Sequence, residues 1–228
     1  MLLTHLAESK VPRRIVCASV SSCGFTMIEV LVTLVVLALG LLGVMGLQAR
    51  GQQAELESYQ RAQALVLVQD MVDRMNANRS DSHNKVYVNG TVATFPVGGG
   101  GNLVNCAALT GAAFDICEWT NQLNGAAEVL SGGACSTTSS ADCAGAMLGA
   151  RGCITYDAGT ELADSTGANL PGTGVYTVTV AWQGVASMSP PPASITCAQN
   201  LYPTSANPDD GMRRAVTATF RIANLNSP

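Results

Sequence analysis

Apolar positions dominate one segment near the start of the chain. Residues 25–47 span 23 positions and carry a single charge, at Glu29. A helix that crosses a bilayer needs about 20 apolar residues, so this segment predicts a membrane-spanning helix. An acidic side chain costs roughly 2.5–3.5 kcal/mol near the centre of such a helix. The presence of Glu29 therefore requires a reason beyond membrane anchoring.

A second helical pattern follows the apolar segment. Residues 48–61 are polar and rich in helix-forming residues, and apolar side chains then recur at spacings of three, four and three. This spacing is typical of one face of a helix, which we expect to dock onto a globular sheet. The residues of the stripe are Leu65, Val68, Val72 and Met75. A helix from residue 25 to about residue 75 would be about 75 Å long. The expected terminators are Asn76, Asn78 and Ser80.

Alternation of apolar and polar residues predicts strands in the last third of the chain. Apolar side chains occupy every second position in residues 176–182 and again in residues 216–222. This alternation is typical of strands with one buried face. Residues 154–156 are a candidate third strand. With the amphipathic helix packed against them, these strands predict an α+β fold built on an antiparallel sheet.

The middle of the chain has weaker patterns. Residues 85–97 alternate around Asn89-Gly90, a dipeptide that favours a hairpin turn. Residues 112–130 place a few large apolar side chains among polar ones, which predicts a short helix. Residues 131–152 are small and polar, which predicts an irregular surface loop.

Composition narrows the class of protein. The formal net charge is −4 and charged residues make up only 12% of the chain. An acidic chain with few basic clusters argues against nucleic acid as a partner. Glycine, serine, threonine, alanine and asparagine are abundant downstream of the apolar segment. This composition favours an extracytoplasmic, β-rich domain with long loops.

The cysteines predict disulfides. Of the eight in the chain, six follow the apolar segment: Cys106, Cys117, Cys135, Cys143, Cys153 and Cys197. An even number beyond a membrane segment indicates pairing in an oxidising periplasm, and six cysteines allow 15 connectivities. We expect Cys106 to pair with Cys117 and Cys135 with Cys143, because each pair closes a short loop. The remaining pair, Cys153 with Cys197, would join two segments that flank the strand at 174–184.

Catalytic and metal-binding patterns do not stand out. The chain has no G-x-S-x-G, H-E-x-x-H or P-loop sequence and no C-x-x-C, and His83 is the only histidine after the apolar segment. We therefore expect neither an enzyme nor a zinc site, and no cofactor. The carboxylates of residues 207–211 could bind calcium, but the full spacing of a calcium loop is lacking and a solvated turn is favoured.

The block GFTMIEVLVTLVVLALGLLG, which begins at Gly24, resembles the class III signal and N-terminal helix of type IV pilins and pseudopilins. In that family a prepilin peptidase cuts after the glycine and N-methylates the new first residue, here Phe25. The resemblance is specific over residues 24–47. It implies a leader peptide (residues 1–24), a transmembrane and assembly helix (25–47), an amphipathic helix continuing into the periplasmic domain (48–80) and a periplasmic β-rich head (81–228).

The leader departs from the family pattern in one respect. Family leaders usually carry basic residues close to the cleaved glycine, whereas Lys10, Arg13 and Arg14 lie well upstream. They still provide the positive cytoplasmic flank that sets orientation. Removal of the leader takes away three basic residues and one acidic residue, so the net charge changes from −4 to −6.

The resemblance also implies a role for Glu29, the fifth residue of the mature chain. In a filament, the amine of Phe25 is buried among neighbouring helices. Glu29 would pair with that amine on an adjacent subunit, because an opposite charge lowers the cost of burying either group. The alternative is a polar side chain that reaches the membrane surface from the first helical turn.

Within the family, several patches resemble minor pilins of the PilV type, the type IV pilus modification proteins. These patches are IEVLVTLVVLALGLLGVMGLQ, QDMVDRMNANR, CEWTNQL, YTVTVAWQG and RRAVTATFRI. The resemblance implies a single-pass protein of the bacterial inner membrane that helps to start pilus assembly at the tip and influences adhesion and twitching motility. Its partners would be other minor pilins, the major pilin, the inner-membrane assembly machinery, prepilin peptidase and membrane lipid. The alternatives are a minor pseudopilin of a type II secretion system and an unprocessed, membrane-anchored periplasmic binding or adhesion module.

Overall fold

The computed structural model describes residues 24–88, 95–100, 103–126, 147–202 and 209–223. The chain divides into two compact units, Met1–Gln48 and Ala49–Pro228. We call them the N-terminal unit and the head unit and describe each by itself. The expected turn at Asn89-Gly90 and the expected pair Cys135–Cys143 lie outside the described residues.

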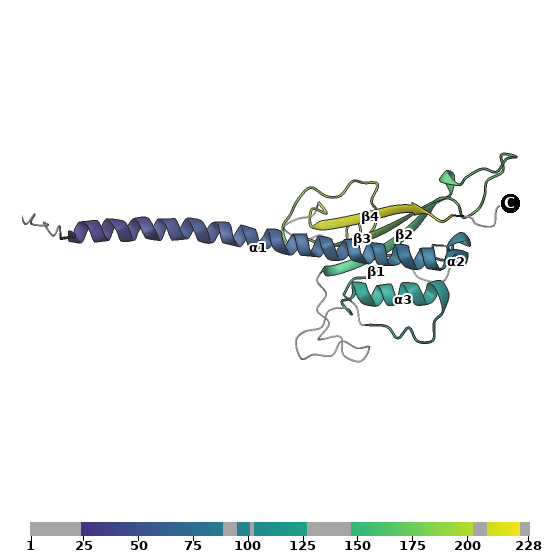
Figure 1. Cartoon of the computed structure of the whole chain (residues 1–228), viewed down its shortest axis with the longest axis horizontal. Coiled ribbons are helices and arrows are strands. Elements are labelled where there is room, and N and C mark those ends of the chain that lie inside the picture. Colours follow the sequence, from purple (N-terminus) through teal and green to yellow (C-terminus); the bar gives the residue numbers. More distant parts are fainter. Residues whose placement is uncertain (1–23, 89–94, 101–102, 127–146, 203–208, 224–228) are drawn as a thin grey trace, which may run out of the picture. The chain divides into compact units, whose positions relative to one another are not determined.

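Helix α1, Met27–Ala77, runs through both units (Figure 1). Within the N-terminal unit, every residue from Gly24 to Gln48 is exposed. Its most apolar stretch has a mean hydropathy of 2.7, and none of that stretch is buried. By length and composition α1 is able to cross a membrane. The helix ends at Ala77, directly before the expected terminator Asn78, which precedes the short helix α2, Arg79–His83.

The part of α1 from Ala49 to Ala77 belongs to the head unit, and one of its faces is buried in the core of that unit. The buried residues are Gln60, Ala64, Leu67, Val68, Met71, Val72 and Met75. The predicted stripe is confirmed at three positions and is wrong at Leu65, whose side chain is 51% exposed. The helix advances about 100° per residue, so the face centred on Ala64 and Met71 leaves Leu65 on its flank. On hydrophobicity alone, Leu65 is a better candidate for the buried face than its smaller neighbour Ala64.

The sheet of the head unit is antiparallel throughout, with the order β1-β2-β3-β4. Its strands are β1 Val97–Gly98, β2 Leu148–Asp157, β3 Val175–Gln183 and β4 Arg213–Arg221. The strands predicted at 176–182 and 216–222 correspond to β3 and β4. The α+β arrangement of a long helix on an antiparallel sheet is thereby confirmed.

Two local predictions are wrong. Residues 148–152 belong to β2 and not to an irregular loop, because they pair with β3 although their small side chains show no alternation. Residues 84–88 form turns and not the first strand of a hairpin. Tyr87 is 1% exposed there, and its hydroxyl donates to Asp115, so its burial serves the core and not a sheet ladder.

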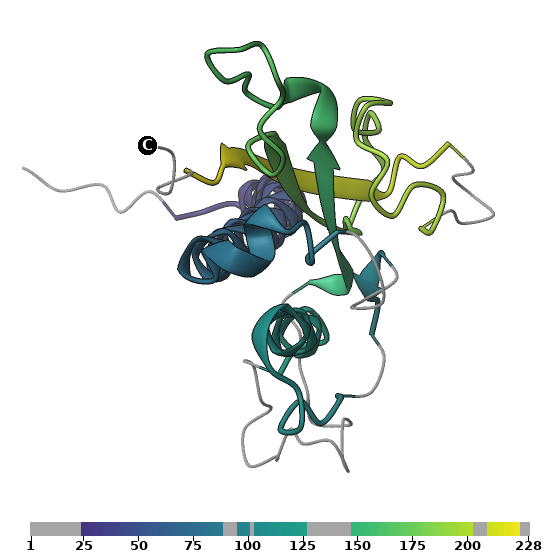
Figure 2. The ribbon, with the colours of Figure 1, turned by 90° about the vertical axis from the view of Figure 1, so that its right-hand side faces the viewer.

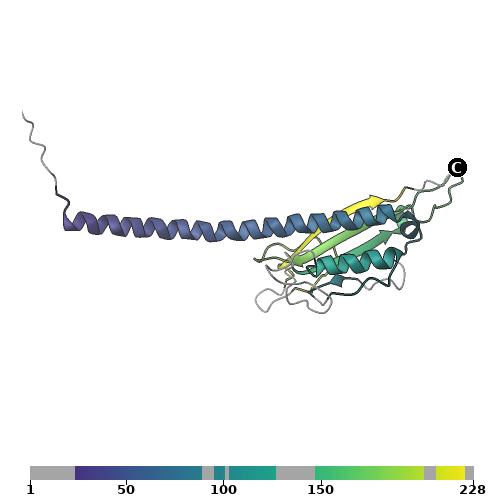
Figure 3. The ribbon, with the colours of Figure 1, turned by 60° about the horizontal axis from the view of Figure 1, so that its bottom comes forward.

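Helix α3, Gly111–Leu123, covers the same face of the sheet as α1 (Figures 2 and 3). The indole Nε1 of Trp119 donates to the carbonyl of Leu67 at 2.9 Å, which joins α3 to α1. A Cβ at Gly152 would lie 2.2 Å from Cη2 of Trp119, so only glycine lets α3 approach β2 this closely. The core therefore lies between two helices and one face of the sheet.

The start of α3 is stabilised from outside the helix. Thr110 occupies the N-cap position but makes no side-chain capping bond. Instead, the carboxylate of Asp81 in α2 accepts from the backbone N–H of Ala112 at 2.9 Å and from the amide of Asn78 at 2.9 Å. An acidic group at a helix N-terminus also interacts favourably with the helix dipole. Thus α2 positions α3 beside the end of α1.

The opposite face of the sheet is covered in part by the segment 194–202. A second buried cluster there contains Cys153, Ala181, Cys197, Ala198 and Tyr202. The Tyr202 hydroxyl donates to the carbonyls of Gly149 at 2.8 Å and Ala181 at 3.2 Å. Alternation predicted one buried face for β3, whereas Ala181 is buried on the second face as well.

Candidate processing and assembly site

The start of α1 brings together the residues that the sequence singled out for processing. Gly24 and Phe25 precede the helix and are exposed. An added Cβ at Gly24 would meet no atom within 4 Å. The Gly24–Phe25 peptide bond therefore lies in accessible chain immediately before the first helical turn, as a protease substrate requires.

Thr26 begins the helix, a role that periodicity did not identify. The backbone N–H of Glu29 lies 3.0 Å from the Thr26 carbonyl and 3.3 Å from its hydroxyl oxygen. A threonine followed three residues later by glutamate is the capping-box pattern, in which the hydroxyl satisfies an otherwise unpaired donor of the first turn. The T-x-x-E spacing in the sequence was the signal for this cap.

Glu29 lies in the first turn of α1 and is exposed. Its carboxylate has no hydrogen bond or ion pair with any residue that the structure describes, whereas its backbone N–H is used by the cap. A negative charge at this end is favoured by the helix dipole. The carboxylate is thus positioned next to residues 25 and 26 and is available to a cation from outside the chain.

The predicted disulfide residues of the described chain lie in the head unit. Cys106 is bonded to Cys117 and Cys153 to Cys197, with Cα–Cα distances of 5.8 Å each. These are the pairings expected from the sequence. The first joins the segment before α3 to α3 itself. The second joins β2 to the segment that covers the outer face of the sheet.

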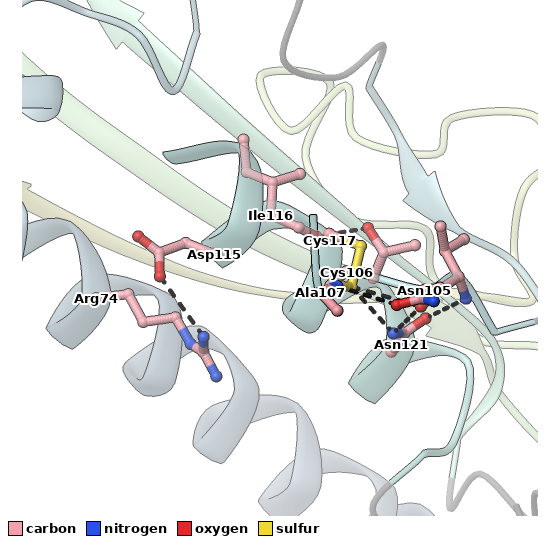
Figure 4. Close-up of a disulfide and its surroundings, with 10 residues drawn as sticks. Arg74, Asn105, Cys106, Ala107, Asp115, Ile116, Cys117 and Asn121 are labelled. Carbon is pink, nitrogen blue, oxygen red and sulfur yellow. Dashed lines mark hydrogen bonds and ion pairs between the residues drawn. A yellow bond between two sulfur atoms is a disulfide. The ribbon is translucent and has the colours of Figure 1, made fainter. Parts of the chain in front are cut away.

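Figure 4 shows the first disulfide beside a polar network on α3. The Asn121 side chain donates to the carbonyl of Val104 at 2.8 Å and accepts from the N–H of Val104 at 2.7 Å. Nearly two turns before Asn121, Asp115 faces Arg74 of α1, with their charged atoms 3.6 Å apart. These contacts fix the segment 103–107 to α3 and α3 to α1.

Burial and hydrogen bonding change the acidity of a few head groups. Burial, together with the bond to Asp115, raises the pKa of the Tyr87 hydroxyl. The hydroxyl of Tyr156 donates to Glu161 at 2.6 Å, and this bond is the main reason that the pKa of Glu161 lies below its ordinary value. These groups are parts of structural contacts, and none forms a nucleophile–base pair of the kind that catalysis needs.

The calcium alternative at residues 207–211 is not supported by the part of the loop that the structure describes. Asp210 is buried, where its carboxylate accepts from Nε of Arg213 and from the N–H of Asn200 at 3.2 Å. It is therefore neither a free ligand nor a solvated turn residue, although Asp209 is exposed. Among the described residues, no group of three or more histidine, cysteine, aspartate or glutamate side chains could hold a metal ion.

Comparison with known proteins gives one match. Residues 20–45 match the family model described as the prokaryotic N-terminal methylation motif. A search of the curated proteins and a search of the solved structures found no match. The matched residues include Gly24, Phe25 and Glu29 and end within the apolar part of α1.

This match covers a short part of the chain, around the start of α1. The motif implies processing by prepilin peptidase and assembly with pilus or secretion machinery, and with the apolar helix it fits a prepilin anchored in the inner membrane with a periplasmic domain. Pilin-like proteins that carry this motif are structural and not enzymatic. The methylation motif, at the start of a helix that continues onto an antiparallel sheet, is the combination found in type IV pilin-like and pseudopilin proteins, which this chain resembles.

Proposed function

We propose that this protein is a minor pilin of the PilV type that helps to start type IV pilus assembly at the pilus tip. It is inserted in the inner membrane, cleaved after Gly24 and N-methylated on Phe25. The observation that carries the proposal is the start of α1, where an accessible Gly-Phe bond precedes a capped helix whose apolar first part, up to Gln48, is fully exposed. The one carboxylate of this part, that of Glu29, has no partner among the described residues. The sequence patches that resemble PilV proteins support the choice within the class.

Glu29 supplies the specificity of assembly in this proposal. Cleavage creates an ammonium at Phe25, and in an assembled bundle that charge is removed from water. An ion pair with Glu29 of a neighbouring subunit offsets part of this desolvation cost, whereas an unpaired buried charge is strongly unfavourable. The pair therefore forms only between processed subunits and aligns their helices along the filament axis.

Processing is tested by N-terminal sequencing and intact mass measurement of the protein from cells with and without prepilin peptidase. The expected mature chain begins at N-methyl-Phe25 in the first cells and keeps its leader in the second. In Gly24→Val, the new side chain has free space in the fold but interferes with peptidase recognition, so the leader should remain. Gly40→Ala, in the helix, is the processing control. An intact leader in wild-type cells with active peptidase would indicate the unprocessed anchored module instead.

The role of Glu29 is tested by Glu29→Gln, which keeps the shape of the side chain and removes its charge. Glu55→Gln changes another exposed glutamate of the same helix and serves as the matched control. We expect Glu29→Gln to be processed normally but to be depleted at least tenfold from sheared pili, while Glu55→Gln behaves as wild type. Equal recovery of the two variants in the pilus fraction would contradict the charge pair.

The choice between pilus and secretion system is tested by deleting the gene. Loss of surface pili and twitching with intact protein secretion is the expected phenotype. Loss of secretion with normal pili would assign the chain to a type II secretion system and reject the minor pilin role. Complementation with the wild-type gene should restore the lost activity, which excludes effects on neighbouring genes.

A further inference from the structure

A small cavity lies on the face of the sheet that α1 and α3 do not cover. Its volume is about 240 Å³, and it lies between β2, β3, β4 and the segment 194–198. Half of the residues that line it carry hydroxyl groups: Thr155, Thr177, Thr179, Ser194, Thr196 and Thr217. Figure 2 shows the strands between the two helices on one side and the loops that follow β3 on the other.

The pairing of the strands arranges the threonines in rows. Thr155 of β2 lies opposite Thr177 of β3, and Thr177 lies opposite Thr219 of β4. In the adjacent row, Thr179 of β3 lies opposite Thr217 of β4. Directly opposite side chains on one face of a sheet have Cβ atoms about 5 Å apart. The hydroxyls therefore form a closely spaced array fixed by backbone hydrogen bonds.

The hydroxyl groups of the cavity are unused by the protein. None of the six makes a hydrogen bond with any residue in the described part of the chain. Elsewhere in the head unit, the hydroxyls of Thr120, Thr160 and Thr173 each donate to a backbone carbonyl at 2.7 Å. Thr179 is only 5% exposed, whereas Thr155, Ser194, Thr196 and Thr217 are exposed, so most of these hydroxyls face solvent and are available to a ligand.

The cavity lacks charge and has an apolar wall. None of its lining residues is ionisable in its present state, because both cysteines are joined in the Cys153–Cys197 disulfide. Phe95, Pro96 and Ile195 supply apolar surface. Phosphates, carboxylates and metal ions require charged or strongly coordinating groups, whereas a neutral sugar presents hydroxyls together with apolar C–H surface. The volume lies below the usual range of about 300–1,000 Å³ for sites that hold drug-sized ligands, which favours a single ring.

The outer wall of the cavity is held rigidly over the sheet. The disulfide ties Cys197 to β2, and the guanidinium of Arg213 donates to the carbonyls of Ile195 at 2.8 Å and Cys197 at 3.2 Å. Arg213 is 1% exposed, and its Nε donates to Asp210. A preformed site loses little conformational entropy on binding. We propose that this cavity binds one neutral sugar residue of a glycan.

The proposal is tested on a printed array of neutral and acidic glycans. The probe is the full-length protein in lipid nanodiscs, biotinylated and tetramerised on streptavidin to raise avidity. The expected result is binding to a set of neutral glycans that share one exposed sugar. Absence of binding to any neutral glycan, or binding restricted to acidic glycans, would overturn the proposal. The site lies wholly within the head unit, so the outcome is independent of processing and pilus assembly.

Two valine substitutions locate the binding. Thr179→Val combined with Thr217→Val removes two hydroxyls of the cavity and keeps β-branched side chains. Thr110→Val removes an exposed hydroxyl before α3 that makes no capping bond and does not line the cavity, and it is the matched control. We expect the double variant to weaken binding at least tenfold and the control to leave it unchanged, with equal thermal unfolding midpoints. Unchanged binding by a folded double variant rejects the cavity as the site. A double variant that fails to fold is replaced by Thr217→Val alone, which must weaken binding for the proposal to stand.

Discussion

The two halves of α1 are both helical but differ in how many of their side chains are buried. From Met27 to Gln48 the helix buries none of its side chains, although most are apolar. Farther along, seven side chains are buried against the sheet and α3. The part of α1 in the head unit therefore has its packing partners within the chain. The part from Met27 to Gln48 exposes apolar side chains that are suited to a bilayer or to neighbouring subunits.

The hydrogen bonds of the two halves differ in the same way. In the N-terminal unit, Thr33 donates to the carbonyl of Val30, three residues away. In the head unit, Trp119 and Trp182 reach residues of α1 that are distant in sequence. Substitutions in the head half should therefore change the free energy of unfolding, whereas matched substitutions in the apolar half should not.

The largest expected difference comes from two methionines of α1. Met71 is fully buried and Met45 is 63% exposed. We expect Met71→Ala to lower the free energy of unfolding of the head unit by about 2–5 kcal/mol, because it removes buried apolar surface and leaves a cavity. Met45→Ala should change it by less than about 0.5 kcal/mol. Denaturant unfolding in detergent, followed by the fluorescence of Trp119 and Trp182, measures both. Equal losses would mean that the two halves are not energetically distinct.

Two glycines should give effects of opposite sign. Gly152→Ala places a methyl group against Trp119 and Leu123, and we expect it to destabilise the head unit by about 1–3 kcal/mol. Gly43 has no atom within 4 Å of an added Cβ. Because alanine favours a helix interior over glycine by about 1 kcal/mol, Gly43→Ala should raise helical content without changing head unfolding. Circular dichroism and thermal unfolding report the two quantities, and a stable Gly152→Ala variant would show that α3 can shift away from β2.

Removing either of two hydroxyls that donate hydrogen bonds of equal length should give a smaller difference in head stability. Ser82 donates to the carbonyl of Met75 and Thr33 to that of Val30, each at 2.8 Å. Ser82 is fully buried, so Ser82→Ala should cost about 1 kcal/mol of head stability. Thr33→Ala should leave head unfolding unchanged. The same denaturant titrations measure this pair, and a loss in Thr33→Ala as large as in Ser82→Ala would contradict the comparison.

The smallest expected effect is an acid dependence confined to the head unit. The bond from Tyr156, then that from the N–H of Gly172, hold the pKa of Glu161 below its ordinary value of 4.5. A carboxylate with a lowered folded-state pKa stabilises the fold above its unfolded pKa, and this contribution is lost as pH falls through the folded value. The unfolding midpoint of the wild type should therefore fall between about pH 5 and pH 3, and that of Glu161→Gln should fall by less. Identical pH profiles for the variant and wild type would exclude this contribution.

The sequence predicts those parts of the fold that depend on strong local periodicity. The extent of α1 follows from one apolar run and one helical stripe, and β3 and β4 follow from alternation. The expected cysteine pairs Cys106–Cys117 and Cys153–Cys197 are those seen in the structure, although six cysteines allow 15 connectivities and the sequence does not determine the pairing.

Features that depend on long-range contacts could not be predicted from local patterns. The start of β2 is made of small residues, and its conformation is imposed by pairing with β3. Likewise, Asp81 stabilises the start of α3, which lies some thirty residues further along the chain. The strand threonines of the cavity have the pattern of ordinary exposed strand positions, and they line a cavity because Phe95, Pro96 and the segment 194–198 lie over them.

The cap formed by Thr26 has a consequence for maturation. Its hydroxyl, its carbonyl and the N–H of Glu29 all belong to the part of the chain that remains after a cut behind Gly24. The first turn of a helix is the costly step of helix formation, and here it is complete without the leader. Removal of the leader is then a change of chemistry at the chain end and not a refolding event. The proposed cut behind Gly24 therefore gives the chain a new cation at its N-terminus and leaves the helix unchanged.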